Sequence, residues 1–224
     1  MSDLVDLLLE KKIIAIVRGT YGEDLKNLAL ALYKGGIRFI EVTFDQKDPK
    51  CLEKTSSAIK MLGSLKTESS VEPLCLGAGT VLNVEQVQIA YDAGAEYIVS
   101  PNTNAKVIAK TKELGMLSIP GAMTPTEILQ AHDLGADVVK LFPSASLGLS
   151  YVKDIMAPIN HVNIIATAGI TEENFASFLA LGLKGAGISG RLTDKNLIAS
   201  GNWSELTQRA QKFVKIAESP LKKL

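Results

Sequence analysis

Eight short apolar runs recur along the chain and are separated by longer, more polar stretches. Several of the runs are rich in valine and isoleucine and show no regular polar alternation, which is typical of strands that are covered on both faces. Each run therefore predicts a buried β-strand. The runs are Ile13–Arg18, Phe39–Phe44, Leu74–Val81, Tyr97–Pro101, Met116–Ala122, Val138–Ser144, Asn163–Ile170 and Gly185–Leu192.

The stretches between the runs carry apolar residues at helical spacing, most clearly in 25–33, 84–93 and 174–181. A glycine follows most of these stretches, where it supplies the left-handed conformation that ends a helix. Hydroxyl residues followed by acids mark helix starts, as in Thr124-Pro125-Thr126-Glu127. The segment Trp203–Leu224 predicts an amphipathic helix, which would either complete the fold as the closing element of a barrel or pack on a neighbouring chain. The segment Lys60–Pro73 is polar and predicts a long loop.

A strand, a helix and a glycine that repeat in this order are typical of parallel βα units. Eight such units in 224 residues predict an α/β protein, a single (β/α)8 TIM barrel that takes up residues 1–224 as one domain. The 46% of hydrophobic residues is ample for one core. An open, doubly wound sheet is the alternative.

The charge balance narrows the choice of partners. The 24 basic and 24 acidic residues cancel, which argues against a nucleic-acid face and against a polybasic membrane patch. No run reaches the roughly 18–20 apolar residues that span a bilayer. The first residues lack the basic start and apolar run of a signal peptide, so we expect a cytoplasmic protein with a small-molecule substrate.

The few cysteines and histidines predict neither a disulfide nor a metal site. Cys51 and Cys75 lie in no CxxC pattern, which favours free thiols in a reducing compartment. His132 and His161 are the only histidines, and neither has an acidic or cysteine partner at ligand spacing. We therefore expect neither a bound metal or other cofactor nor a Ser-His-Asp triad.

Lys140 is the most informative residue because it falls inside the apolar run that begins at Val138. Lysine is rarely buried, and a buried amine without a partner tends to lose its proton. A neutral amine is a nucleophile for the carbonyl group of a keto acid. Alternatively, Lys140 points outward or pairs with Asp137.

Charged residues in other runs strengthen the reactive interpretation of Lys140. Arg18 and Glu41 also stand in or close otherwise apolar strands. In a (β/α)8 barrel the active site lies at the carboxyl ends of the strands. Three charged residues from three strands therefore predict one site at the barrel mouth.

Five motifs together resemble those of one family of bacterial enzymes. They are Glu41-Val42-Thr43, Gly77-Ala78-Gly79-Thr80-Val81-Leu82, Val99-Ser100-Pro101-Asn102, Ile119-Pro120-Gly121 and Lys140-Leu141-Phe142-Pro143-Ser144, and they occur in this order at the predicted strand ends. The chain is similar to the class I 2-keto-3-deoxy-6-phosphogluconate (KDPG) and 4-hydroxy-2-oxoglutarate (KHG) aldolases from about Ile13 to Leu192. The segments 14–19 and 142–148 resemble the branch that acts on the galactonate epimer, whereas Thr167 resembles the gluconate branch.

The resemblance implies a role for each site residue. Lys140 would form a Schiff base with the substrate ketone, and Glu41 would be the general acid and base. Arg18, Thr80 and Pro101 would hold the pyruvate carboxylate, with Phe142 packed beside it. The distal phosphate would bind at the positions that follow the last two strands, namely Ala168, Gly169, Ser189 and Gly190. The products would be pyruvate and glyceraldehyde 3-phosphate, no metal or cofactor would be needed, and the chain would form a homotrimer.

Three departures from the family pattern leave alternatives open. Asp45 stands where the family often has an arginine, and we expect Arg18 to take over the carboxylate. Ala168 replaces a glycine, and Ser189 stands one position before the usual phosphate-binding serine. KHG, which would yield pyruvate and glyoxylate, is therefore an alternative substrate. A phosphate-binding barrel isomerase that uses Glu41 as its base, or a catalytically silent binding barrel, are further alternatives.

Overall fold

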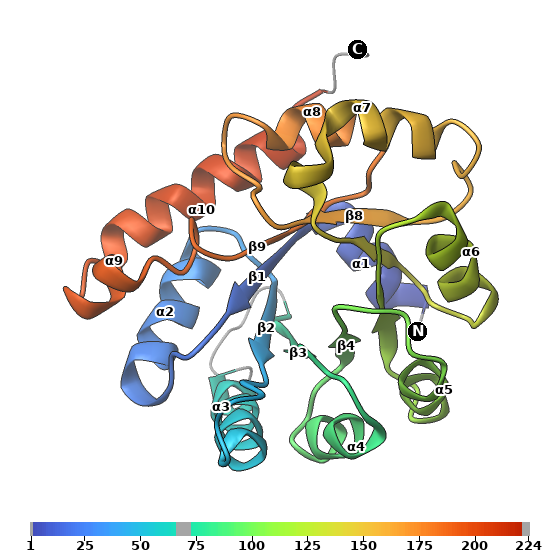
Figure 1. The fold of residues 1–224 in the computed structure, drawn as a ribbon. Coiled ribbons are helices and arrows are strands. Elements are labelled where there is room, and N and C mark those ends of the chain that lie inside the picture. The colour runs from blue at the N-terminus through green and yellow to red at the C-terminus, as the bar shows by residue number, and fades with distance from the viewer. Residues whose placement is uncertain (1, 66–72, 221–224) are drawn as a thin grey trace.

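The strands form one parallel sheet that curls into a nearly closed barrel (Figure 1). The computed structural model describes residues 2–65 and 73–220. Neighbouring strands pair in parallel in the order β5-β4-β3-β2-β1-β9-β8-β7-β6. The strands are β1 (Ile13–Val17), β2 (Phe39–Thr43), β3 (Cys75–Gly79), β4 (Tyr97–Val99), β5 (Leu117–Ile119), β6 (Gly121–Ala122), β7 (Val139–Leu141), β8 (Ile164–Thr167) and β9 (Ala186–Ile188).

Each of the eight predicted runs contains a strand, and the (β/α)8 architecture is confirmed. The fifth run is divided at Pro120 into β5 and β6, because proline has no N–H to donate to a ladder. β5 pairs with β4, and β6 pairs with β7. The interrupted strand therefore joins the two ends of the sheet, and the open-sheet alternative is wrong.

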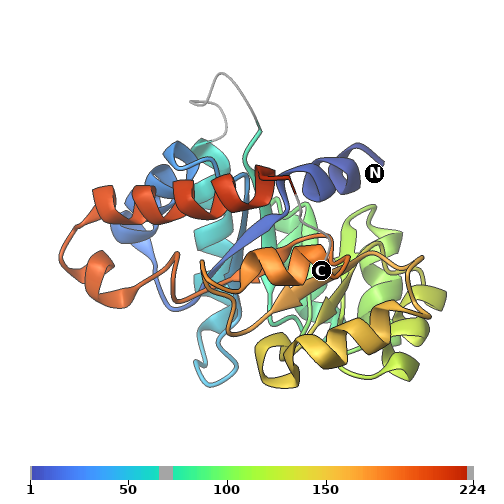
Figure 2. The ribbon, with the colours of Figure 1, turned by 90° about the horizontal axis from the view of Figure 1, so that it is seen from above.

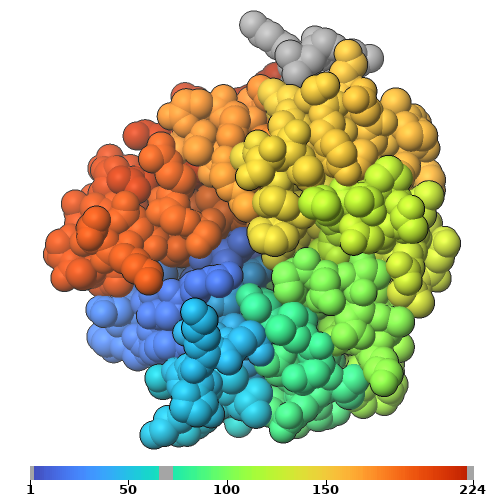
Figure 3. Space-filling view, viewed as in Figure 1, coloured from blue at the N-terminus to red at the C-terminus, as the bar shows by residue number. Residues whose placement is uncertain are grey.

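The helices surround the barrel, and Figure 3 shows segments from both halves of the chain meeting around the centre of one face. The capping box predicted at the start of α6 is present, with Thr124 and Glu127 as its two members. The helices are α1 (Ser2–Lys11), α2 (Gly22–Lys34), α3 (Cys51–Leu65), α4 (Val84–Asp92), α5 (Ala105–Glu113), α6 (Pro125–Asp133), α7 (Ser144–Met156), α8 (Phe175–Ala180), α9 (Lys195–Ala199) and α10 (Trp203–Glu218).

The prediction of a loop over Lys60–Pro73 is wrong for its first part, which belongs to α3. Leu62 and Leu65 are buried and continue the apolar face that Ile59 begins. Apolar spacing of three residues decided the structure here, although the surrounding residues are polar. Residues 66–72 of the predicted loop lie outside the described residues.

The amphipathic helix predicted over Trp203–Leu224 is confirmed for Trp203–Glu218 as α10, which packs on the outside of the barrel against α2 and α8. Residues 221–224 of that prediction lie outside the described residues. The buried face of α10 consists of Leu206, Ala210, Phe213 and Ala217. Of the two predicted positions, on its own barrel or on a neighbour, the helix takes the first. Among the described residues, no helix is both long and apolar enough to cross a bilayer.

The helix α1 covers the amino-terminal end of the strands (Figures 1 and 2). Leu8 is only 1% exposed and belongs to the cluster that fills the barrel interior, with Phe39 and Tyr97 among its members. A second, larger cluster lies between the strands and the outer helices. The amino-terminal end of the barrel is thus filled with apolar side chains, so a substrate can enter only at the carboxyl ends of the strands.

Candidate active site

A cavity of about 380 Å³ opens at the carboxyl ends of the strands. Its walls come from the ends of β1, β2, β7, β8 and β9. Eight of the ten predicted site residues line it, namely Arg18, Glu41, Lys140, Phe142, Ala168, Gly169, Ser189 and Gly190. The tertiary structure thus brings together residues that are up to 172 positions apart in the chain, from 18 to 190.

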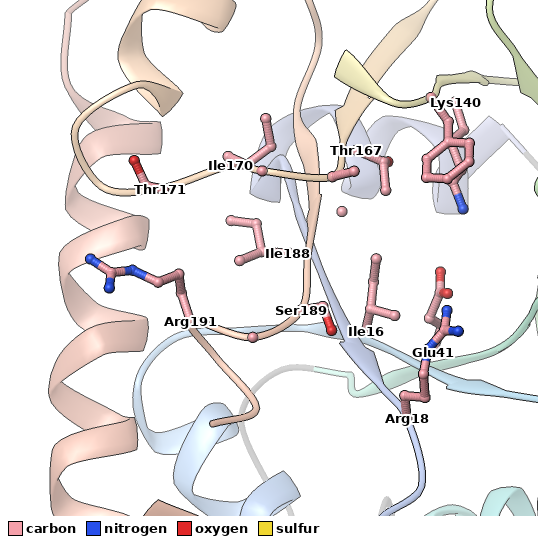
Figure 4. Close-up of a pocket in the computed structure, with 15 residues that line it drawn as sticks. Ile16, Arg18, Glu41, Lys140, Thr167, Ile170, Thr171, Ile188, Ser189 and Arg191 are labelled. Carbon is pink, nitrogen blue, oxygen red and sulfur yellow. The ribbon is translucent and has the colours of Figure 1, made fainter. Parts of the chain in front are cut away.

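Lys140 points into this cavity rather than outward (Figure 4). Its side chain is almost fully buried, and its Nζ lies 5.3 Å from the centre of the Phe142 ring. The alternative partner Asp137 instead accepts hydrogen bonds from the Lys112 amine and the Ser118 N–H, so the proposed Lys140–Asp137 pair is wrong. Burial lowers the pKa of the Lys140 amine; the Glu41 carboxylate opposes this shift and the Arg18 guanidinium adds to it.

Glu41 faces the same space from β2 (Figure 4). Its side chain is only 2% exposed. Its Oε1 lies 2.1 Å from the position that a β-carbon would take at Gly79, so only glycine leaves room for the carboxylate there. Burial raises the pKa of the Glu41 carboxyl, and the positive charges of Lys140 and Arg18 oppose this shift. Lys140 and Glu41 form no ion pair within 4.0 Å, although both side chains line the same cavity.

Arg18 is an exposed cation at the cavity rim, directly after β1. Within the described residues its guanidinium forms no hydrogen bond or ion pair, so its donors are available to an anion. Asp45 takes no part in the cavity; its carboxylate accepts the N–H of Lys47 in an exposed turn. Arg191, the third cavity-lining cation, is paired with Glu172 at 2.8 Å and with Glu173 at 3.7 Å.

Two turns form the far side of the cavity from Lys140 (Figure 4). In the first, Ala168 and Gly169 adopt left-handed conformations with φ of 75° and 72°. Asn174 closes this turn, because its amide donates to the Gly169 carbonyl and its Oδ1 accepts the Thr171 N–H. In the second, the Ser189 carbonyl accepts the N–H groups of residues 192 and 193. Backbone turns of this kind can present N–H groups to an anion.

Thr80 and Pro101 are not among the residues that line the cavity. They follow β3 and β4 and so lie at the same end of the barrel. Thr80 has a φ of 57°, and its carbonyl accepts a hydrogen bond from Gln46. Their contact with a substrate stays a prediction.

The structure adds cavity residues that were not predicted as substrate contacts. They include Ile16, Thr167, Thr171, Ile188 and Arg191. The Thr167 hydroxyl is buried and has no hydrogen-bond partner. A threonine within an apolar run gives no signal of its own in sequence, since threonine is common in strands.

Comparison with known proteins agrees with this geometry. The family model of KDPG and KHG aldolases matches residues 4–209. A probable 2-dehydro-3-deoxy-6-phosphogalactonate aldolase of Rhizobium meliloti is 34% identical over 203 residues, which are 90% of this chain and 89% of the relative. A 2-dehydro-3-deoxy-phosphogluconate aldolase of Treponema pallidum is 35% identical over 217 residues, which are 96% and 98% of the two chains.

Solved structures show the same architecture. A structure described as native KDPGal superposes with a TM-score of 0.79 at 30% identity and covers 91% of this chain and 93% of its own. The KDPG aldolase from Legionella pneumophila, captured with pyruvate as a covalent carbinolamine, gives a TM-score of 0.81 at 24% identity, over 93% and 97% of the two chains. The match to the family model and the two relatives of 34% and 35% identity exclude the isomerase and silent-barrel alternatives. The chain belongs to the KDPG and KHG aldolase family and is a class I aldolase, a carbon–carbon lyase.

Proposed function

We propose that this aldolase cleaves a 2-keto-3-deoxy-6-phospho sugar acid, with gluconate or galactonate configuration, into pyruvate and glyceraldehyde 3-phosphate. Lys140 is the residue that forms the Schiff base. The observation that carries this proposal is that one cavity at the carboxyl ends of the strands holds a buried amine, Lys140, and a buried carboxyl group, Glu41. Burial lowers the pKa of the amine and raises the pKa of the carboxyl group. The two shifts favour the neutral amine and the protonated acid, which imine formation requires.

The reaction begins with attack of the neutral Lys140 amine on the C2 ketone. The resulting carbinolamine loses its hydroxyl group as water and gives an iminium ion. This cation accepts the electron pair of the C3–C4 bond when that bond breaks, so the aldehyde leaves and an enamine remains. Protonation at C3 and hydrolysis then release pyruvate and restore the amine.

In this proposal Glu41 moves the protons of the reaction. In its protonated form it donates to the carbinolamine hydroxyl as water leaves. As a carboxylate it accepts the proton of the C4 hydroxyl during cleavage, directly or through a water. Because burial raises the pKa of the Glu41 carboxyl, the protonated form is favoured more than in an ordinary glutamate, and the same group can then act as base.

The two ends of the substrate are anions, and two parts of the cavity match them. The Arg18 guanidinium suits the carboxylate, since its planar fork can make two parallel hydrogen bonds. Thr80 and Pro101 complete this end in our proposal, and Phe142 packs against the pyruvyl carbons. The phosphate binds to the backbone N–H groups around Ala168-Gly169 and Ser189-Gly190, the usual phosphate position of this barrel.

The epimer and the length of the substrate are the finer choices within this proposal. The two curated relatives described above carry a galactonate name and a gluconate name at nearly equal identity. The smaller KHG is the alternative, because Ala168 and Ser189 depart from the family's phosphate pattern. We also propose a homotrimer, in line with the family resemblance. Size-exclusion chromatography with light scattering measures the mass of the assembly, and the mass of a monomer would contradict the trimer.

Borohydride trapping tests the proposed function. We expect pyruvate and borohydride to produce a reduced adduct on the peptide that contains Lys140, detectable by mass spectrometry. The Lys140→Ala variant should show none, whereas Lys153→Ala, which removes an exposed lysine of α7, should react as the wild type does. No adduct on folded protein at saturating pyruvate would overturn the Schiff-base role.

Turnover of the two phosphorylated epimers and of KHG then identifies the substrate. We expect cleavage of at least one phosphorylated acid to exceed that of KHG. The rate should survive a chelator, because the iminium ion, not a metal, accepts the electrons. Reversible loss of activity in EDTA would contradict this mechanism.

A further inference from the structure

Below the proposed catalytic carboxylate, the barrel interior contains a buried tyrosine hydroxyl. Tyr97 of β4 is 0% exposed, and its hydroxyl has no hydrogen-bond partner among the described residues. The rest of its ring packs in the apolar cluster that also contains Phe39. A phenylalanine would fill this space without burying a polar group, so the hydroxyl calls for an explanation.

The register of three neighbouring strands places Tyr97 beside Glu41. Gly77 of β3 pairs with Glu41 of β2 on one side and with Tyr97 of β4 on the other. These three positions form one row across the sheet, and the middle residue has no side chain. Both outer side chains therefore face the barrel interior with open space between them.

The Tyr97 ring uses this space. Its Cζ, which carries the hydroxyl, lies 2.4 Å from where a β-carbon of Gly77 would stand, and its Cε2 lies 2.2 Å away. The ring thus crosses β3 toward β2, where its centroid is 5.7 Å from that of Phe39. Phe39 precedes Glu41 by two residues on the same strand and so points to the same side.

The Glu41 carboxylate uses the second inward gap on β3, over Gly79. Gly77 and Gly79 are two residues apart on β3 and face the same side of the sheet. The Tyr97 ring, over Gly77, and the Glu41 carboxylate, over Gly79, therefore follow one another along the inner face of β3. Burial raises the pKa of the Tyr97 hydroxyl, and the charge of Glu41 is the second cause of this shift. The hydroxyl is thus a protonated donor, and the carboxylate is a nearby acceptor.

We infer that Tyr97 is a positioning residue for Glu41, whose carboxylate accepts a hydrogen bond from the Tyr97 hydroxyl through one buried water. This inference rests on the proposed function, in which Glu41 is the acid and base. A buried hydroxyl without a protein partner is ordinarily satisfied by such a water when a second polar group is near. The bridge stabilises the ionised form of Glu41 and holds it against Gly79.

Other ionisable groups act on the same pair. Lys140 from β7 and Arg18 from the end of β1 face Glu41 and lower its pKa. Cys75 of β3 and Glu96, which precedes β4, act on Tyr97 and raise its pKa. None of these four changes in a Tyr97→Phe variant, so a change in the pH profile of that variant reports the lost hydroxyl.

The first test compares wild type with Tyr97→Phe in the exchange of pyruvate methyl protons in heavy water. This exchange needs the enamine and a proton carrier but no aldehyde. The limb of the pH profile that reports Glu41 is the one that disappears in Glu41→Gln. In Tyr97→Phe we expect this limb to move to higher pH, because loss of a hydrogen-bond donor raises the pKa of the Glu41 carboxyl. The exchange rate at neutral pH should fall about threefold to tenfold, with KM for pyruvate within about twofold of wild type.

Two comparisons separate this role from packing. Thr111→Val removes a buried hydroxyl on α5, away from the cavity, and should leave the profile in place. In a Glu41→Gln background, Tyr97→Phe should lower the rate no further, since the two residues act as one unit. An unmoved limb overturns the inference, and a raised melting temperature would then identify the hydroxyl as an unsatisfied core group.

A high-resolution crystal structure of the wild-type protein gives an independent answer. A water within hydrogen-bonding distance of both Tyr97 Oη and Glu41 is expected, and a dry contact there overturns the inference even if Tyr97→Phe does not fold. Failure of the proposed function would look different. Wild-type protein would then form no borohydride adduct with pyruvate at all.

Discussion

At the scale of single residues, the site depends on two ionisable groups whose pKa values are shifted in opposite directions by the same cause. Burial lowers the pKa of Lys140 and raises that of Glu41. Each shift increases the neutral form, and each is opposed by the charge of the other residue. Arg18 at the rim acts on both in the same sense, because a positive charge lowers either pKa.

Replacing Arg18 tests this electrostatic role. In Arg18→Met the pKa of Lys140 should rise, since one of the two causes that lower it is gone. The acidic limb of the profile of kcat/KM against pH should therefore move to higher pH, and KM for pyruvate should rise about tenfold or more. Arg209→Met, which removes an arginine paired with Glu205 and Asp194, should leave both unchanged. An unchanged KM for the Arg18 variant would exclude it as the carboxylate ligand.

The shifted pKa of Lys140 also predicts how stability depends on pH. Between its lowered folded pKa and the usual lysine value, the unfolded chain holds a proton that folded Lys140 has lost. The free energy of unfolding therefore rises as pH increases between the folded and the unfolded pKa of Lys140. Below the folded pKa the buried amine carries its charge, and the destabilisation caused by burying it is largest there. Lys140→Met should gain most over wild type at the lower pH values. Urea midpoints measured across the window check this, and a difference that grew with pH would contradict it.

At the scale of elements, the strand β3 makes room for the site because two of its inward positions, Gly77 and Gly79, have no side chain. Gly77 faces the Tyr97 ring and Gly79 faces the Glu41 carboxylate. Neither glycine has a positive φ, so the requirement is space rather than backbone conformation. The opposite wall depends on a different device, the link that Ser144 forms between β7 and β8.

Gly79→Ala should therefore impair catalysis more than folding alone would explain. The new β-carbon would stand 2.1 Å from Glu41 Oε1, so the carboxylate must move away from its position in the cavity. We expect kcat to fall about a hundredfold, as for loss of a general acid or base, with a smaller change in KM. Gly63→Ala is the matched control, because its β-carbon meets nothing within 4 Å on α3. An unchanged kcat would show that the Glu41 carboxylate can move away from the new β-carbon without loss of activity.

Ser144→Ala should lower stability through the lost link. The buried Ser144 hydroxyl donates to the Leu141 carbonyl at 2.7 Å and accepts the Thr167 N–H at 3.0 Å. Alanine leaves both backbone groups without this partner, at a cost of about 1–3 kcal/mol in the free energy of unfolding. Denaturant titration measures this. Ser56→Ala, whose exposed hydroxyl contacts its own helix, should change stability far less.

At the scale of the whole molecule, the barrel has one filled end and one reactive end. The helix α1 and the interior cluster fill the amino-terminal end, and the cavity lies at the carboxyl ends of the strands. Stability and chemistry are thereby assigned to opposite ends of one fold. Tyr97 belongs to the interior cluster and also shares a row of the sheet with Glu41, so the filled end and the reactive end meet at Tyr97.

Leu8→Ala tests this division. Leu8 is 1% exposed in the interior cluster, and its truncation should cost about 2–5 kcal/mol in the free energy of unfolding. The kinetic constants of the protein that remains folded should be those of wild type. Leu129→Ala, at a half-exposed position on α6, should cost much less. A large loss of kcat in folded Leu8→Ala protein would mean that the two ends are coupled.

The sequence predicted the eight strands because buried parallel strands produce continuous apolar runs, and it predicted the C-terminal helix from its apolar face. It did not predict α1, and it missed the end of α3, where a few leucines continue a helix through polar surroundings. Eight of ten predicted site residues line the cavity. Thr80 and Pro101 do not, because a position at a strand end leaves the direction of a side chain open.

The alternation of strands and helices follows from the sequence alone, as does the presence of a lysine and a glutamate in strands that should be apolar. Both are local properties, since periodicity and residue type can be read within a few positions. That Lys140 faces Glu41 rather than Asp137, and that Gly77 separates Glu41 from Tyr97, follows only from the folded barrel. Closure of the barrel and the register between strands decide these contacts, and both are properties of the assembled sheet.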